Sequence, residues 1–149
     1  MSIEFEKYIS DLRDLEDLII GKKLGLGIHR DVYEFYFSDE KVLKVANCAE
    51  GRANNIIEYR IYDELQNSKY KKHFAKCFGV STNGKYLLQE KITIKDIKKY
   101  PKTIPHFFTD TKHENYGWTN KGKFVCCDYS LTIITNGFTD KMKKAKWYA

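Results

Sequence analysis

The sequence has 149 residues, of which 42% are hydrophobic and 31% are charged. This length predicts one domain with a buried core, and the composition is that of a soluble globular protein. No apolar run approaches the length of a membrane span, and the N-terminal residues lack the pattern of a secretory signal. We therefore expect a cytoplasmic protein without a membrane partner.

The net charge of +6 makes nucleic-acid binding one class to consider. Two features argue against it. The lysines are scattered, and only four of the 26 basic residues are Arg, the residue usually chosen for phosphate and base contacts. The one dense basic cluster, residues 141–149, is interpreted as a solvated helix end. A nucleic-acid partner is therefore a third and weaker alternative, because net charge alone does not define a partner.

The four cysteines lack C-x-x-C spacing and a neighbouring histidine cluster: Cys48, Cys77, Cys126 and Cys127. Adjacent residues of a strand point to opposite faces, so Cys126 and Cys127 would not easily share a metal. We interpret all four as buried, reduced thiols.

The first segment is predicted to be a helix that ends at Gly21. Its apolar residues recur at helical spacing: Phe5, Tyr8, Ile9, Leu12, Leu15, Leu18 and Ile19. Alternating patterns then predict three consecutive antiparallel strands at residues 22–26, 31–37 and 41–46, with a turn at residues 38–41.

A second helix is predicted over residues 51–66, because apolar residues recur every four positions: Ala53, Ile57, Ile61 and Leu65. Strands at residues 74–80 and 85–90 flank Asn83-Gly84, a strong hairpin signal. An irregular passage follows, then a hairpin at residues 115–118 and 123–127 and a closing segment at residues 131–149. This order of elements predicts the α+β class.

Three groups of residues could carry chemistry. Gly25 and Gly27 lie between two strands, where the backbone could offer N–H groups to phosphate, although two such glycines more often form only a turn. Lys44 projects from a strand with two apolar faces, so its ammonium needs an anionic partner unless it reaches solvent at an edge. Glu58 shares its helix face with the apolar residues Ile61, Tyr62 and Leu65, which predicts a Lys44–Glu58 pair, although charges at the border of a helix are common.

The order of these residues resembles the protein kinase fold, including small-molecule kinases of the aminoglycoside phosphotransferase kind. "LGLGIHRDVY" is similar to the glycine-rich loop, with Arg30 in place of the third glycine, and "VLKV" is similar to the lysine strand, with Glu58 as its helix partner. "DTKHEN", residues 110–115, matches the D-x-K-x-x-N catalytic loop. "CDYS" stands where D-F-G would, with Asp128 at the metal position, and the resemblance covers residues 22–130.

The resemblance implies ATP and Mg²⁺ as cofactors and assigns a role to each matching residue. The implied sites are, for the nucleotide, Gly25, Gly27, Lys44, Glu58 and Glu90; for the metal, Asn115 and Asp128; and for catalysis, Asp110 and Lys112. Lys44 would hold phosphates, Asp110 would accept or orient a substrate hydroxyl, and Lys112 would neutralise the transferred phosphoryl group.

The implied fold is a minimal, single kinase-like domain. It has an N-terminal helix at 1–20, an N-lobe at 21–91 with a five-stranded antiparallel sheet and one main helix, and a reduced C-lobe at 92–149 with a catalytic-loop hairpin. Only 21 of the 149 residues follow Asp128, which leaves no room for an A-P-E motif or a large helical lobe. Phe108-Thr109 replaces the usual His-Arg and Tyr129-Ser130 replaces Phe-Gly, which argues against regulated switching.

Two functions from different classes follow. One is an ATP- and Mg²⁺-dependent phosphotransferase acting on a protein Ser or Thr hydroxyl; compact chains of this kind resemble those of some bacteriophages, which suggests a host protein as target. The other is a weak or inactive pseudokinase-like protein that sequesters or inhibits a host partner. A reduced lower lobe would expose apolar surface, so a homodimer is also open, and the N-terminal helix could cover that surface or join an interface.

Overall fold

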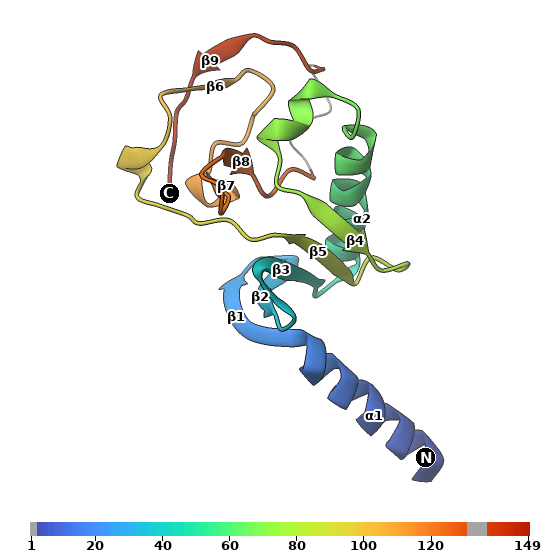
Figure 1. Cartoon of the computed structure of the whole chain (residues 1–149). Helices are drawn as coiled ribbons and strands as arrows, with labels where there is room; N and C mark the ends of the chain where they lie inside the picture. Colours follow the sequence, from blue (N-terminus) through green and yellow to red (C-terminus); the bar gives the residue numbers. More distant parts are fainter. Residues whose placement is uncertain (1–2, 131–136) are drawn as a thin grey trace.

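The computed structural model of the chain describes residues 3–130 and 137–149, except the side chains of Phe5, Tyr8, Ile9 and Leu12. A five-stranded antiparallel sheet in the order β1-β2-β3-β5-β4 packs against one main helix, and small two-stranded units lie beyond it (Figure 1). The sheet strands are β1 (Ile20–Leu26), β2 (Arg30–Phe35), β3 (Ser38–Ala46), β4 (Cys77–Val80) and β5 (Tyr86–Glu90). The predicted α+β class with this sheet and helix is confirmed.

The connection between β2 and β3 differs from the prediction. Residues 38–41 were expected to form a turn, but Ser38 begins β3 and the turn consists of Tyr36 and Phe37. The register explains the difference: Tyr33 pairs with Leu43, which is buried, and a one-residue shift would move the buried side chains of β3 to the other face. The turn is therefore left to two exposed aromatic residues.

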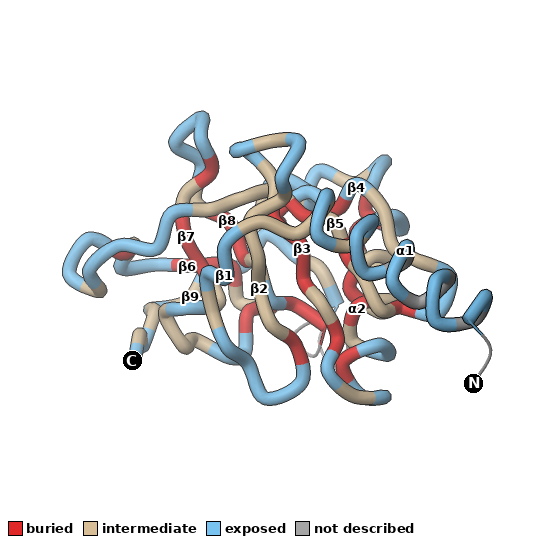
Figure 2. Tube along the Cα trace, turned by 90° about the horizontal axis from the view of Figure 1, so that it is seen from below, coloured by how far each residue is buried: buried red, intermediate tan, exposed pale blue. Residues whose placement is uncertain are grey.

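Helix α1 (Ile3–Ile19) runs directly into β1 and projects from the sheet, away from the C-terminal part of the molecule (Figure 1). Glu16 attaches it to β5 by accepting hydrogen bonds from Lys85 Nζ at 3.2 Å and from the Tyr86 hydroxyl. Most of its described surface is exposed (Figure 2). The suggestion that α1 covers the reduced C-terminal part is wrong, and most of its predicted apolar stripe lies outside the described side chains. No helix within the described ranges is long and apolar enough to cross a membrane.

Helix α2 (Ala49–Glu64) turns the face with Glu58 toward the sheet, and this face differs from the apolar stripe that the sequence predicted. Its buried residues are spaced three or four apart: Gly51, Asn55, Glu58 and Tyr62. The stripe predicted from Ala53, Ile57 and Ile61 is wrong, because these residues are exposed or half-buried, and of that stripe only Leu65 is buried. Two polar residues can occupy the buried face because each has hydrogen-bond partners there.

The C-terminal part contains little regular structure. Its elements are the 3₁₀ turns η2 (Ile97–Lys99) and η3 (His113–Asn115), and the strands β6 (Thr103–Pro105), β7 (Tyr116–Trp118), β8 (Phe124–Cys126) and β9 (Met142–Lys144). The 3₁₀ turn η1 (Lys69–His73), between α2 and β4, packs against β8. The predicted hairpin is confirmed as β7–β8. The basic tail is not a helix end: β9 pairs with β6, and Trp147 Nε1 donates to the Pro101 carbonyl at 2.8 Å. The predicted closing segment begins with residues 131–136, which lie outside the described residues.

Aromatic side chains hold this part together. Phe107 and Phe108 have ring centroids 4.8 Å apart, and Phe108 meets Tyr116 at 5.1 Å. Phe74, which follows η1, lies 5.0 Å from the ring of Tyr129. Large rings bury much apolar area per residue, so a cluster of them can fix a segment that lacks long helices. It also fixes the backbone next to Asp128.

The cysteines are free thiols, as expected, but only Cys77 and Cys126 are buried, whereas Cys48 and Cys127 are half-buried. The expectation of four buried thiols is therefore wrong for two of them. Burial raises the pKa of the Cys77 thiol to about 11, so this cysteine is protonated at neutral pH.

Candidate active site

The predicted ion pair between β3 and α2 is present. Lys44 Nζ lies 2.5 Å from Glu58 Oε1, and both side chains are buried. In the sheet Lys44 pairs with Leu87, which is fully buried, so the lysine projects from the face that α2 covers. Glu58 is otherwise held by Gln89 Nε2 at 2.9 Å and by the Tyr129 backbone N–H at 3.1 Å.

The environment of Glu58 keeps it ionised. Burial by itself would raise its pKa, but the charges of Arg30 and Lys44 and their hydrogen bonds lower the pKa to about 2. A fully buried carboxylate with several donors is satisfied electrostatically and anchors the groups around it.

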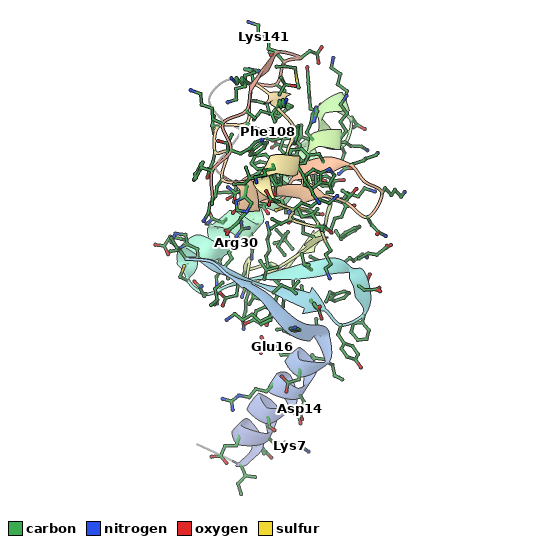
Figure 3. All side chains as sticks on the ribbon, turned by 90° about the vertical axis from the view of Figure 1, so that its left-hand side faces the viewer. Lys7, Asp14, Glu16, Arg30, Phe108 and Lys141 are labelled. Atoms are coloured by element: carbon green, nitrogen blue, oxygen red, sulfur yellow. The ribbon has the colours of Figure 1, made fainter. Side chains whose placement is uncertain are left out.

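Arg30 is the member of this cluster to which the sequence assigned no role. It begins β2, is buried, and directs its guanidinium to three side chains from two distant segments. Nη1 donates to Asn55 Oδ1 at 3.1 Å, while Nη2 donates to Glu58 Oε2 at 3.2 Å and to Asp128 Oδ1 at 2.8 Å. Burial would lower the pKa of Arg30, but the two carboxylates raise it, so Arg30 stays charged. Figure 3 shows Arg30 at the junction of the sheet and the C-terminal part.

Asp128 lies beside this buried cluster although it is 84 positions from Lys44 in the sequence. Lys44 Nζ also donates to the backbone carbonyl of Cys127, the residue before Asp128. The aspartate side chain is 48% exposed, so one edge of the carboxylate meets Arg30 while part of it reaches solvent. The cluster thus combines two cations, Lys44 and Arg30, with two carboxylates, Glu58 and Asp128.

The predicted catalytic-loop residues form a second, more exposed group. Asn115 Nδ2 donates to Asp110 Oδ2 at 3.2 Å, and the Lys112 backbone N–H donates to Asp110 Oδ1 at 3.1 Å. The side chain of Lys112 pairs with Glu114 at 3.3 Å. The two groups are adjacent, because the Cys127 backbone N–H donates to the Asn115 carbonyl at 2.8 Å.

Tyr148, near the C-terminus, also contacts Asp110 and forms an isolated β-bridge with Lys112. The Tyr148 hydroxyl donates to Asp110 Oδ1 at 2.7 Å, and the backbone N–H of Tyr148 donates to the Thr111 carbonyl at 3.3 Å. Nothing in the sequence pattern of the basic tail indicated this contact, because it depends on the pairing of β9 with β6.

The two glycines differ in what they do. Gly25, Val32 and Lys44 pair in succession across β1, β2 and β3, which places Gly25 roughly 10 Å from Lys44 along one row of the sheet. A Cβ at Gly27 would lie 2.4 Å from the Arg30 carbonyl, so the turn itself requires this glycine. A Cβ at Gly25 would meet no atom of the described residues within 4 Å, so the fold does not require a glycine there.

Glu90 lies apart from the cluster. It follows Gln89 at the end of β5 and therefore points to the opposite face of the sheet. Its side chain accepts from the Lys76 backbone N–H at 3.2 Å, and its own N–H donates to the Lys76 carbonyl at 2.8 Å. The structure thus joins Lys44 directly to Glu58, links Asp128 to Glu58 through Arg30, and places Asp110 and Asn115 beside this group. Glu90 is instead bonded to Lys76, the residue before β4.

Two further residues of the cluster had a detectable signal in the sequence. Asn55 lies three positions before Glu58, on the same face of α2, and bridges to the Lys44 and Gly84 carbonyls at 3.2 and 2.8 Å. Gln89 lies two positions after buried Leu87 and therefore shares its face of β5. Both are polar residues that share a face with a residue already expected to point into the protein, Glu58 for Asn55 and Leu87 for Gln89, and buried polar residues need hydrogen-bond partners.

Asp128 and Asn115 offer oxygen atoms of the kind that could hold a magnesium ion. Asp128 supplies a partly exposed carboxylate, and Asn115 uses its amide nitrogen on Asp110, which leaves its amide oxygen for a cation. Carboxylate and amide oxygens are hard ligands of the kind that Mg²⁺ prefers. A scan of protein-family models found none that matches the chain, and a search of curated proteins found no significant match.

Proposed function

We propose that this chain is a compact kinase-like phosphotransferase that uses ATP and Mg²⁺ to phosphorylate a Ser or Thr hydroxyl of a protein. The observation that carries the proposal is the position of Lys44 Nζ, which bonds both Glu58 on α2 and the carbonyl that precedes Asp128. Lys44 on β3 and Glu58 on α2 therefore lie next to Asp128, whose carboxylate is of the kind that binds a metal ion. Phosphoryl transfer requires this combination of positioning and charge compensation.

Each residue has a definite task in this proposal. Lys44, fixed by Glu58, neutralises the nucleotide phosphates, and Asp128 and Asn115 hold Mg²⁺, which supplies charge neutralisation at the phosphates when bound. Asp110 accepts the proton of the substrate hydroxyl, and Lys112 stabilises the negative charge of the transferred group. The open space beside Gly25 supports the proposal, because a glycine that the fold does not require leaves room for a ligand near the backbone.

A second candidate function is a binding protein without catalysis, built on the same fold. The contact between Arg30 and Asp128 favours it, because the guanidinium already satisfies part of the carboxylate that would bind the metal. In this second function the same fold binds a protein partner, and this binding does not require nucleotide.

Incubation with γ-labelled ATP and Mg²⁺, with the chain alone and with a bacterial lysate, distinguishes the two functions. Label should appear on protein and should be lost in Lys44→Met and Asp128→Asn. Lys71→Met and Asp63→Asn, which change exposed residues of the same types, should keep it. Melting curves with and without Mg·ATP form the second measurement, because a ligand that binds only the folded state raises its melting temperature. A rise in melting temperature without labelled protein supports the binding protein. A folded chain that shows neither a rise in melting temperature nor labelled protein rules out the phosphotransferase.

A further inference from the structure

Three metal-ligating side chains meet outside the candidate active site, where the β1–β2 turn touches the start of α2. They are His29, Cys48 and Glu50, whose ligand atoms all lie within 4.8 Å of one another. His29 Nδ1 and Cys48 Sγ are 3.3 Å apart. We infer that this cluster is a binding site for a transition-metal ion, Zn²⁺ by its chemistry, with a water molecule as fourth ligand.

The ligand types select the metal. Thiolate, imidazole and carboxylate are the three protein ligands that zinc uses, and sulfur disfavours Mg²⁺ and Ca²⁺. With Zn–S near 2.3 Å and Zn–N near 2.0 Å, two ligands of a tetrahedral ion are separated by about 3.5 Å. The 3.3 Å between Nδ1 and Sγ is close to this separation, so a small outward movement of the side chains would accommodate the ion.

The backbone around the cluster holds the ligands in place. The Asn47 N–H donates to the His29 carbonyl at 2.9 Å, which ties the turn to the segment before α2. A Cβ at Gly51 would lie 2.1 Å from the same carbonyl, so only glycine allows the turn to approach the helix this closely. Arg30, the first residue of β2, is fixed to Asn55 of α2. Ligands from two segments therefore face each other across a rigid contact, which reduces the entropy lost on metal binding.

The position of Cys48 suits binding of a metal ion better than capping of helix α2. It occupies the N-cap position of α2 but makes no side-chain cap hydrogen bond, and its sulfur faces His29 instead. Without a metal the same atoms form a thiol–imidazole hydrogen bond. With zinc the thiol proton is released and the ion links the turn between β1 and β2, which contains Gly27, to α2. This inference does not depend on the proposed function.

Zinc titration of the metal-free, reduced full-length chain tests the inference, with a chromophoric chelator as competitor. One equivalent should bind, and Cys48→Ser should weaken the affinity by at least about 100-fold, since loss of even an outer-shell partner lowers metal affinity about 10–100-fold. Cobalt should give a thiolate charge-transfer band that Cys48→Ser and His29→Gln abolish. Cys127→Ser, a change at the other half-buried cysteine, and Asp128→Asn should leave both signals unchanged.

Retention of native far-UV circular dichroism shows whether each variant is folded. His29→Gln changes only a turn side chain, so it tests the site even where the Cys48 variant is unstable. The inference would be overturned if the folded native chain showed no saturable zinc binding, or if the Cys48 and His29 variants bound zinc as tightly as the native chain does. In that outcome the cluster is only a hydrogen-bonded cap on the turn.

Discussion

Arg30 and Asp128, 98 positions apart in the sequence, are joined by a 2.8 Å ion pair between Nη2 and Oδ1. The same guanidinium nitrogen also contacts Glu58, so one side chain connects the glycine turn, helix α2 and the segment after β8. In the proposed function Asp128 is a metal ligand. The positive charge of Arg30 therefore lies beside the carboxylate at which Mg²⁺ would bind.

Replacement of Arg30 by Met should raise the affinity of the nucleotide-free chain for Mn²⁺, used as a probe for Mg²⁺, by at least about tenfold. Two unit charges about 4 Å apart interact by ~4 kcal/mol at the effective dielectric constant near a protein surface. A third of that repulsion already corresponds to a tenfold change in affinity. Mn²⁺ titration followed by electron paramagnetic resonance measures it, and Arg60→Met, on the exposed face of α2, is the control.

The same replacement should lower stability by about 3 kcal/mol, because Glu58 loses one of its two cationic partners in a buried site. Urea unfolding measures this change.

For the Mn²⁺ prediction, unaltered affinity in a folded Arg30→Met protein would show that the guanidinium does not compete with a metal at Asp128.

Glu58 should make the stability of the chain depend on pH in acid. Its folded-state pKa is about 2, below the ordinary value of 4.5, so protons bind more tightly to the unfolded chain. Its contribution is fully present above about pH 5 and is lost as the pH falls towards 2, and a shift of this size corresponds to about 3 kcal/mol. Urea unfolding of native protein and Glu58→Gln should show a stability difference that shrinks across this window. A difference that is constant with pH would mean that Glu58 is not held ionised by its partners.

The fold was largely predictable where structure is local. Gly84 follows Asn83 in a turn with φ of +77°, and a Cβ there would lie 2.3 Å from the Arg52 carbonyl, so the hairpin signal had a steric basis. The pairing of Thr103 with Lys144 was not predictable, because no turn links these strands and each has only three residues. Such non-local pairing depends on the surrounding packing, which single-sequence patterns do not contain.

The candidate site was likewise predictable in one part and not in another. The Lys44–Glu58 contact followed from a general requirement that a buried charge has a partner. Arg30 could not be placed, because a residue that follows two turn glycines is expected to be exposed. Its burial depends on Asn55, Glu58 and Asp128, which reach it from two distant segments.

Tyr129→Phe should lower the free energy of unfolding by about 1–2 kcal/mol. The Tyr129 hydroxyl is buried, donates to the Ala75 carbonyl at 2.9 Å and lies 3.0 Å from Cys77 Sγ, so its removal leaves buried polar atoms unpaired. Urea midpoints measure the effect, and Tyr36→Phe at an exposed turn should change them little. Because the Tyr129 backbone still donates to Glu58, the melting shift with Mg·ATP should persist. Wild-type stability in the variant would mean that this hydroxyl contributes no net hydrogen bond.

Tyr148→Phe should raise kcat for phosphoryl transfer by roughly fivefold, the rate equivalent of about 1 kcal/mol for one hydrogen bond. The Tyr148 hydroxyl donates to Asp110 Oδ1, and this bond stabilises the carboxylate in the state before it accepts the proton of the substrate hydroxyl. The KM for ATP should stay unchanged, because Asp110 acts on the hydroxyl and not on the nucleotide. Initial-rate assays over a range of ATP concentrations measure both constants, with Tyr36→Phe as the matched control. If kcat falls instead, Tyr148 positions Asp110 productively, and the bond belongs to the working geometry of the site.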